Sequence, residues 1–174
     1  MANYNPSTIE RIGDIKNGIF VESSISLFSV WGETVQRYYF QVTNRVIIHA
    51  LFAEVTTTIA GAVQTVFNYI QDTPSIALAA LSTVHASADT FVPGRRLTYV
   101  GGSVAATAIT LSGGISYLPA TIPTILGVSP TAAGVNGVGR IGFLSSVANA
   151  TAGALKFGCL YTPIDPGACV VALL

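Results

Sequence analysis

Residues 51–72 read LFAEVTTTIAGAVQTVFNYIQD, and the fold class depends on how this stretch is interpreted. Its apolar side chains recur at helical spacing, at Val55, Ile59, Val63, Phe67 and Ile70. A helix here would hold four threonines and would have Gly61 at its centre, and both residue types are poor choices for a helix interior. Residues 51–58 and 63–70 are instead rich in β-branched and aromatic residues. We therefore expect two strands that form a β-hairpin, with a short link at residues 59–62.

The rest of the chain beyond Gly32 also consists largely of short strand candidates. Gly, Pro, Asn or Asp separate most of its further strand candidates, which are residues 33–43, 45–58, 75–84, 95–102, 104–113, 139–147, 154–164 and 168–174. Asn44 divides the first two candidates. Larger side chains alternate with smaller ones along residues 154–161, and the turn-like residues 162–167 suggest a second hairpin that pairs this strand with residues 168–174.

Many short strands separated by turn signals are typical of a sandwich or barrel. We expect an all-β fold, a single antiparallel β-sandwich of jelly-roll-like form. A length of 174 residues suits one domain with a substantial core. Residues 1–20 are polar and mixed, so we expect them to form an N-terminal arm in front of a β-sandwich domain at residues 21–174.

Charge is scarce in this sequence. Charged residues make up 9% of the chain, against roughly 25% in an ordinary soluble domain, and the formal net charge is +0. A surface with so little charge favours association, so we expect an oligomer. The few Lys and Arg residues form no basic stripe with interleaved aromatic residues, which argues against nucleic acid as a partner.

Because the mean hydropathy is high, a membrane must also be considered as a partner. Residues 97–139 carry no charge, but Gly and Pro interrupt them, so no continuous apolar span of about 20 residues exists. The first 18 residues show no apolar core preceded by positive charge, as a secretory signal would. We expect no membrane association and synthesis in a cytoplasm.

The sequence gives little support to catalysis. His49 lies in the densest apolar run, which favours an interior histidine with a satisfied ring. Ser82, His85 and Asp89 are close in sequence and could supply a hydrolase triad, but no GxSxG motif accompanies them. An exposed loop histidine is the simpler interpretation of His85. No catalytic residue is assigned, and we expect a protein that is not an enzyme.

Cofactor and metal sites are equally weakly supported. Gly137, Gly139 and Gly142 lack a P-loop lysine and are better explained by tight β-turns. Cys159 and Cys169 flank a turn, so a disulfide is geometrically possible, but two buried reduced cysteines are the preferred interpretation. Two cysteines are too few for a structural zinc site, and no close pair of acidic residues suggests calcium. We assign no cofactor and no metal.

The sequence contains one adjacent pair of cations that could bind another chain. Arg95 and Arg96 follow Pro93-Gly94 and could contact a carboxylate on another chain. The simpler alternative is a pair of solvated turn charges.

Two long segments carry a resemblance to a known class of proteins. RVIIHALFAEVTTTIAGAVQTVFNYIQDTPS, at residues 45–75, and GRIGFLSSVANATAGALKFGCLYTPIDPGACVVAL, at residues 139–173, are similar in texture and order to small virion structural proteins of tailed bacteriophages. The resemblance covers roughly residues 45–174, whereas residues 1–44 match nothing in that class. It is a likeness of pattern, without an invariant motif.

This resemblance implies a capsid decoration or cement protein. Such proteins are all-β, commonly homotrimeric, and seated on the outer face of a phage head, where they bridge and stabilise subunits of the major capsid protein. The implied location is the capsid exterior of a virion assembled in the host cytoplasm. The alternative is a receptor-binding or fibre-attachment module of the same virion, which would display a stacked platform of exposed rings or a long trimerising stalk. The sequence shows no stalk. The candidates for such rings are Trp31, Tyr38, Tyr39, Tyr69, Tyr99, Tyr117 and Tyr161.

Overall fold

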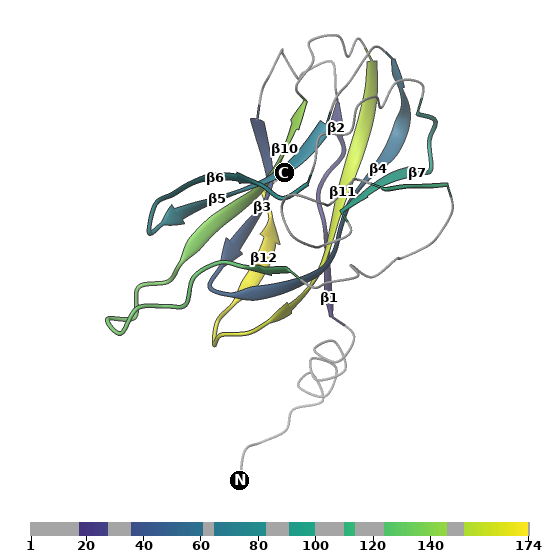
Figure 1. The fold of residues 1–174 in the computed structure, drawn as a ribbon. Helices are drawn as coiled ribbons and strands as arrows, with labels where there is room; N and C mark the ends of the chain where they lie inside the picture. The colour runs from purple at the N-terminus through teal and green to yellow at the C-terminus, as the bar shows by residue number, and fades with distance from the viewer. Residues whose placement is uncertain are drawn as a thin grey trace.

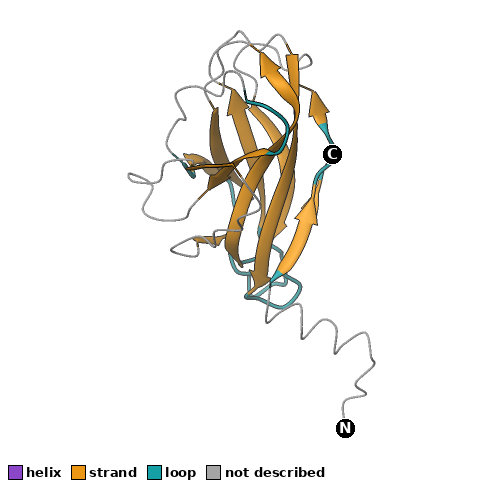
Figure 2. Cartoon of the chain, turned by 90° about the vertical axis from the view of Figure 1, so that its right-hand side faces the viewer, coloured by secondary structure: helices purple, strands orange, loops and turns teal. Residues whose placement is uncertain are grey.

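The computed structural model describes residues 18–27, 36–60, 65–82, 91–99, 110–113, 124–145 and 152–173. These residues form strands and connecting turns, with no helix among them (Figures 1 and 2). The strands are β1 (Ile19–Glu22), β2 (Ser26–Leu27), β3 (Gln36–Thr43), β4 (Val46–Ala60), β5 (Thr65–Thr73), β6 (Ile76–Ala80), β7 (Arg95–Tyr99), β8 (Thr110–Gly113), β9 (Thr124–Leu126), β10 (Val138–Ser145), β11 (Ala152–Pro163) and β12 (Cys169–Ala172). The expectation of an all-β fold is confirmed.

Two antiparallel sheets pack against each other as a sandwich. Sheet A has the order β1-β11-β4-β7-β8, with β2 also paired to β11 and β9 also paired to β4. Sheet B has the order β12-β3-β10-β5-β6. Figures 1 and 2 show the two layers in views that differ by a 90° turn.

The pairing pattern is that of a jelly roll. Eight of the strands pair in nested antiparallel fashion, as β1 with β11, β3 with β10, β4 with β7, and β5 with β6. The first and third pairs belong to sheet A, and the second and fourth belong to sheet B. A long ribbon folded over in this way produces the two-sheet jelly roll. The expected β-sandwich of jelly-roll-like form is therefore present, with β2, β8, β9 and β12 added to it.

Both predicted hairpins are wrong, although their strands are present. β4 belongs to sheet A and β5 to sheet B, so residues 51–72 cross between the sheets instead of folding back within one. β11 and β12 are divided between the sheets in the same way. The reason is that β4 and β11 are interior strands whose two edges are already occupied, β4 by β11 on one side and by β7 and β9 on the other.

The core lies between the sheets and is built around aromatic rings. Phe157 of β11 stacks on Tyr39 of β3, with ring centroids 3.7 Å apart, and meets the edge of Phe143 of β10 at 5.1 Å. Phe67 of β5 packs on Phe143 at 4.9 Å. The edge-to-face contacts of Phe143 with Phe157 and Phe67 add to the stabilisation from burial itself. The predicted larger face of residues 154–161 is confirmed as the core-facing side, because its side chains, Leu155, Phe157, Cys159 and Tyr161, are all buried.

The proposed arm falls mainly outside the described residues, which begin at Gly18. Ile19 and Phe20, which the sequence-based boundary assigned to the arm, belong to β1 and pair with Tyr161 and Leu160. The short strands β1, β2 and β9 were not expected from the sequence. Within the described residues, no helix is long and apolar enough to cross a membrane.

Candidate functional site

The two catalytic candidates that can be placed have structural partners. His49 is half-buried on β4, and its Nε2 lies 2.7 Å from Oγ1 of Thr162 on β11. The expected satisfied histidine is thus present, although its side chain is not fully interior. Ser82 is buried, and its hydroxyl oxygen accepts the backbone N–H of Phe67 at 3.0 Å. His85 and Asp89 lie outside the described residues, so the three members of the possible triad are not brought together here.

Every carboxylate in the described part of the chain is ion-paired with a cation of the same chain. Asp165 pairs with Arg45 and Asp72 with Arg140, each at 2.7 Å, while Glu54 pairs with Arg96 and Glu22 with Lys156, each at 2.5 Å. The described residues contain no group of three or more His, Cys, Asp or Glu side chains that could hold a metal ion. Each of these four ion pairs joins two segments that are distant in the sequence.

Arg96 of β7 has a role that neither sequence interpretation foresaw. Its guanidinium pairs with Glu54 on the neighbouring β4 and lies over the Phe52 ring, 4.7 Å from the centroid. Phe20 of β1 stacks on the same ring, with centroids 6.0 Å apart. Gly158 of β11 leaves the space under this ring, because a Cβ atom there would collide with it. Arg96 is thus used within its own chain, while Arg95 is exposed and lies over the Phe91 ring.

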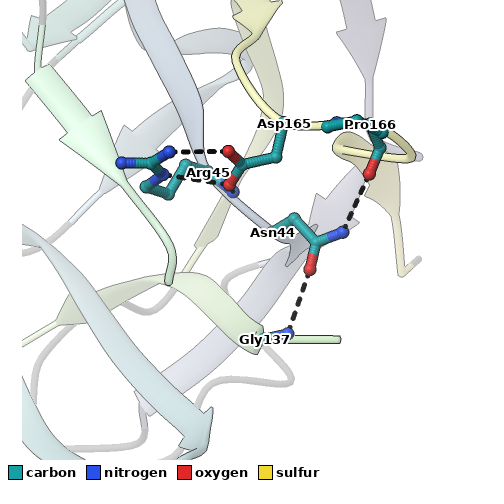
Figure 3. A network of polar contacts seen from close by, with 5 residues as sticks. All are labelled: Asn44, Arg45, Gly137, Asp165 and Pro166. Atoms are coloured by element: carbon teal, nitrogen blue, oxygen red, sulfur yellow. Dashed lines mark hydrogen bonds and ion pairs between the residues drawn. The ribbon is translucent and has the colours of Figure 1, made fainter. Parts of the chain in front are cut away.

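Three crossings between the sheets meet at one end of the sandwich, around Asn44 (Figure 3). Asn44 connects β3 to β4 and has a φ of 56°, a left-handed conformation that Asn tolerates better than most residues. Its Oδ1 accepts the N–H of Gly137 at 3.0 Å, and its Nδ2 donates to the carbonyl of Pro166 and to Oδ1 of Asn136, each at 3.2 Å. One buried side chain therefore ties the β3–β4 crossing to the segments before β10 and before β12.

The neighbouring Arg45 reinforces this corner (Figure 3). Its Nε and one terminal nitrogen donate to the two oxygens of Asp165 at 2.9 and 2.7 Å, a bidentate pair, and its backbone N–H donates to the same carboxylate at 3.2 Å. These hydrogen bonds from Arg45 hold the pKa of Asp165 below its usual value. Three donors of Arg45 thus converge on one carboxylate and join the β3–β4 crossing to the β11–β12 crossing.

A loop of small uncharged residues extends from this corner. Residues 131–136 are all exposed and belong to the connection between β9 and β10, where the green trace projects from the sandwich in Figure 1. The loop is closed by its own bonds, since the Thr131 N–H donates to the Val135 carbonyl at 2.9 Å and the Gly134 N–H donates to the Thr131 carbonyl at 2.8 Å. This loop is therefore held in shape before any partner binds.

The glycines near this loop do not form the tight turns that the sequence suggested. Gly139 and Gly142 are residues of β10, and both are needed because neighbouring atoms approach closely. A Cβ atom at Gly139 would collide with the Tyr69 hydroxyl, and one at Gly142 would collide with the Gln36 side chain. Their role is close packing on a strand.

Both cysteines are free. Cys159 is fully buried on β11, and burial raises the pKa of its thiol, so the neutral form is favoured. Cys169 is half-buried and begins β12 in the other sheet. Of the two cysteines expected to be buried, Cys159 is buried, whereas Cys169 is only half-buried.

The described surface exposes several large apolar side chains, while its carboxylates are all engaged within the chain. Those exposed by 38% or more are Phe20, Ile25, Val92, Ile125, Val135, Ile164, Val171 and Leu173. Among the described tyrosines, Tyr39 and Tyr161 are buried and Tyr38 and Tyr69 are half-buried. Trp31 and Tyr117 lie outside the described residues, as does the side chain of Tyr99.

Comparisons of the chain with protein-family models, with curated proteins and with solved structures found no match.

Proposed function

We propose that this chain is a structural, non-enzymatic protein that decorates and cements a bacteriophage capsid, binding the major capsid protein on the outside of the head. It acts as an oligomer, and three copies is the state that the resemblance to phage virion proteins implies. It would be made in the host cytoplasm and reside on the virion exterior.

One observation carries this proposal. The described carboxylates are all paired internally, whereas eight large apolar side chains are exposed. Such a surface can bury apolar area against another protein without stripping water from unpaired acidic groups. An extended protein partner fits these properties better than a small charged substrate does.

The fold and the corner at Asn44 are compatible with such a role. Jelly rolls are used in viral capsid proteins, and they also occur in lectin domains, so the topology alone does not choose between a cement and a receptor-binding protein. The alternative virion role calls for an exposed aromatic platform. Of the four tyrosine side chains that the structure describes, Tyr39 and Tyr161 are buried and Tyr38 and Tyr69 are half-buried, so none of these four offers a fully exposed ring, which supports cementing.

The experiment that tests the proposal is co-sedimentation of the purified chain with phage heads that lack it, followed by electron microscopy of the decorated particles. We expect saturable binding and density at repeated sites over the head. Val135→Lys places a charge on the preformed loop and tests whether that loop contacts the shell, with Val92→Lys as the matched variant at another exposed valine. Density confined to the tail would favour the receptor-binding alternative, and no binding to heads or tails would refute both.

A further inference from the structure

We infer that the free edge of β12 is a contact between copies of this chain, in which the backbone of one copy pairs with a strand of the next. This inference rests on the oligomeric part of the proposed function and does not depend on capsid binding. It assigns the contact to residues 171–173 of sheet B, because the backbone of Val170 is already hydrogen-bonded to the Tyr161 phenol of the same chain.

The first observation concerns the backbone of β12. β12 is the terminal strand of sheet B and pairs with β3 along one side, while the described residues provide no strand for its other side. The Leu173 N–H donates to the Tyr39 carbonyl of β3 at 2.9 Å. Successive residues of an antiparallel strand direct their backbone groups to opposite sides. The N–H and C=O of Ala172 therefore point away from β3, toward the free edge.

The second observation is that this edge lacks the features that normally prevent pairing. Proteins protect free edges with charged side chains, proline or bulges. Residues 168–173 contain neither charge nor proline, and the register of β12 on β3 runs without a bulge. Val171 and Leu173 are exposed by 44% and 40%. Both the main chain and the side chains of this edge are thus suited to an apolar strand partner.

The neighbouring edge strand of sheet A carries a charged residue, whereas β12 carries none. β1 lies against β12 and is the corresponding edge strand of its own sheet. It carries Glu22, which is ion-paired with Lys156 on the adjacent β11. A strand that approached β1 would have to accommodate this exposed charge pair, so β12 is the better surface for pairing.

The absence of charge also indicates which partner fits. A charged partner would lose hydration at this edge without meeting a counter-charge. A second copy of the chain presents the same uncharged edge, and backbone pairing supplies hydrogen bonds to Ala172 while Val171 and Leu173 are removed from water. The chain itself is therefore the partner that we assign to β12.

Hydrogen exchange at Ala172 tests the contact without a mutation. The amide of Ala172 should be protected at concentrations where light scattering shows an oligomer, and it should exchange faster on dilution as the mass falls. The amide of Leu173, which is bonded to Tyr39, should stay protected at both concentrations. Free exchange of the Ala172 amide in an oligomeric sample would overturn the inference, as would a wild-type chain that is monomeric at every concentration tested.

Two variants test it independently. Ala172→Pro removes an N–H that makes no bond to β3, and Val171→Lys places a charge on the edge. Both should reduce the mass to that of one chain while the circular dichroism remains that of a β protein, whereas Val92→Lys should keep the wild-type mass. Retention of the wild-type mass by both edge variants would refute the contact. An oligomer that depends on β12 but does not bind heads would refute the capsid proposal alone.

Discussion

The side-chain oxygen of Asn44 accepts a hydrogen bond from the backbone N–H of Gly137, a residue 93 positions further along the chain, at 3.0 Å. The Asn44 N–H in turn donates to the Gly137 carbonyl at 2.8 Å. The reciprocal pair joins the β3–β4 crossing to the start of β10, although these segments belong to separate regions of the sequence. We therefore expect the hydrogen bonds of Asn44 to contribute more to the stability of this corner than the burial of its side chain does.

Replacing Asn44 by alanine should reduce the free energy of unfolding by about 2–5 kcal/mol. A buried N–H without its acceptor costs about 1–3 kcal/mol, and the left-handed conformation adds about 1–2 kcal/mol for an alanine. Asn44→Asp keeps the acceptor for Gly137 but turns a carboxylate oxygen toward the Pro166 carbonyl, so it should also destabilise the fold and reports on the donor side of the network. Denaturant unfolding of the two variants measures the difference. Equal stability of Asn44→Ala and the wild type would show that the corner does not hold the sheets in register.

Gly127 lies beside this corner and should tolerate no side chain. Its φ is +91°, and a Cβ atom there would collide with the backbone carbonyl of Asn44. Gly134 has a similar φ of +77° but nothing within 4 Å of such an atom, so Gly134→Ala measures the conformational cost alone, about 1–2 kcal/mol. Gly127→Ala should cost roughly 2–5 kcal/mol, because overpacking is added to that cost. Thermal unfolding that ranks the two variants in the opposite order would contradict this packing.

The stability should fall in alkali because of Tyr69. Burial, followed by the nearby Asp72 carboxylate, raises the pKa of Tyr69 from 10.0 to about 12. A pKa raised in the folded state means that the folded chain holds the proton more tightly than the unfolded chain does. Its contribution is therefore fully present below pH 10 and is lost as the pH rises toward 12. Unfolding free energies measured across this range, together with the absorbance of the phenolate, would check the prediction.

Tyr69→Phe separates this effect from general alkaline unfolding. The phenol donates to the amide oxygen of the buried Gln71, so its loss should cost about 1–3 kcal/mol at neutral pH. The variant should nevertheless lose less stability than the wild type between pH 10 and 12. Burial also raises the pKa of Tyr161, which leaves a residual dependence in the variant. An unchanged slope would rule out Tyr69 as the titrating group.

The sequence predicted the positions of the strands better than it predicted which strands pair with each other. β-Branched and aromatic composition is local information, so β3, β4, β5, β10 and β11 were all expected near their observed positions. Whether consecutive strands pair depends on distant segments. β4 cannot pair with β5 because β11 and β7 already occupy its edges, and those strands begin 92 and 35 residues after the end of β4.

The contacts at the candidate functional site also join segments that are distant in the sequence, so local sequence patterns could not predict them. Asn44 was recognised as a divider of two strands, but its bonds to Gly137 and Pro166 could not be foreseen from neighbouring residues. The pair between Arg96 and Glu54 likewise joins β7 to β4 across 42 positions. The uncharged segment 168–173 was visible in the sequence, yet its place at the edge of sheet B follows from the topology alone.

The final prediction concerns the segment before β1. Deletion of residues 1–17 keeps Gly18 and the whole of β1, whose residues pair with Gly158–Tyr161 of β11. We therefore expect the melting temperature to change little and the binding to phage heads to weaken. Deletion of residues 1–22 is the matched control, because it also removes Phe20 from the Phe52 ring and Glu22 from Lys156 and should lower the melting temperature. Calorimetry and co-sedimentation with undecorated heads measure the two properties separately. A large loss of stability in the shorter deletion, with unchanged head binding, would show that residues 1–17 belong to the folded domain and not to a shell-binding arm.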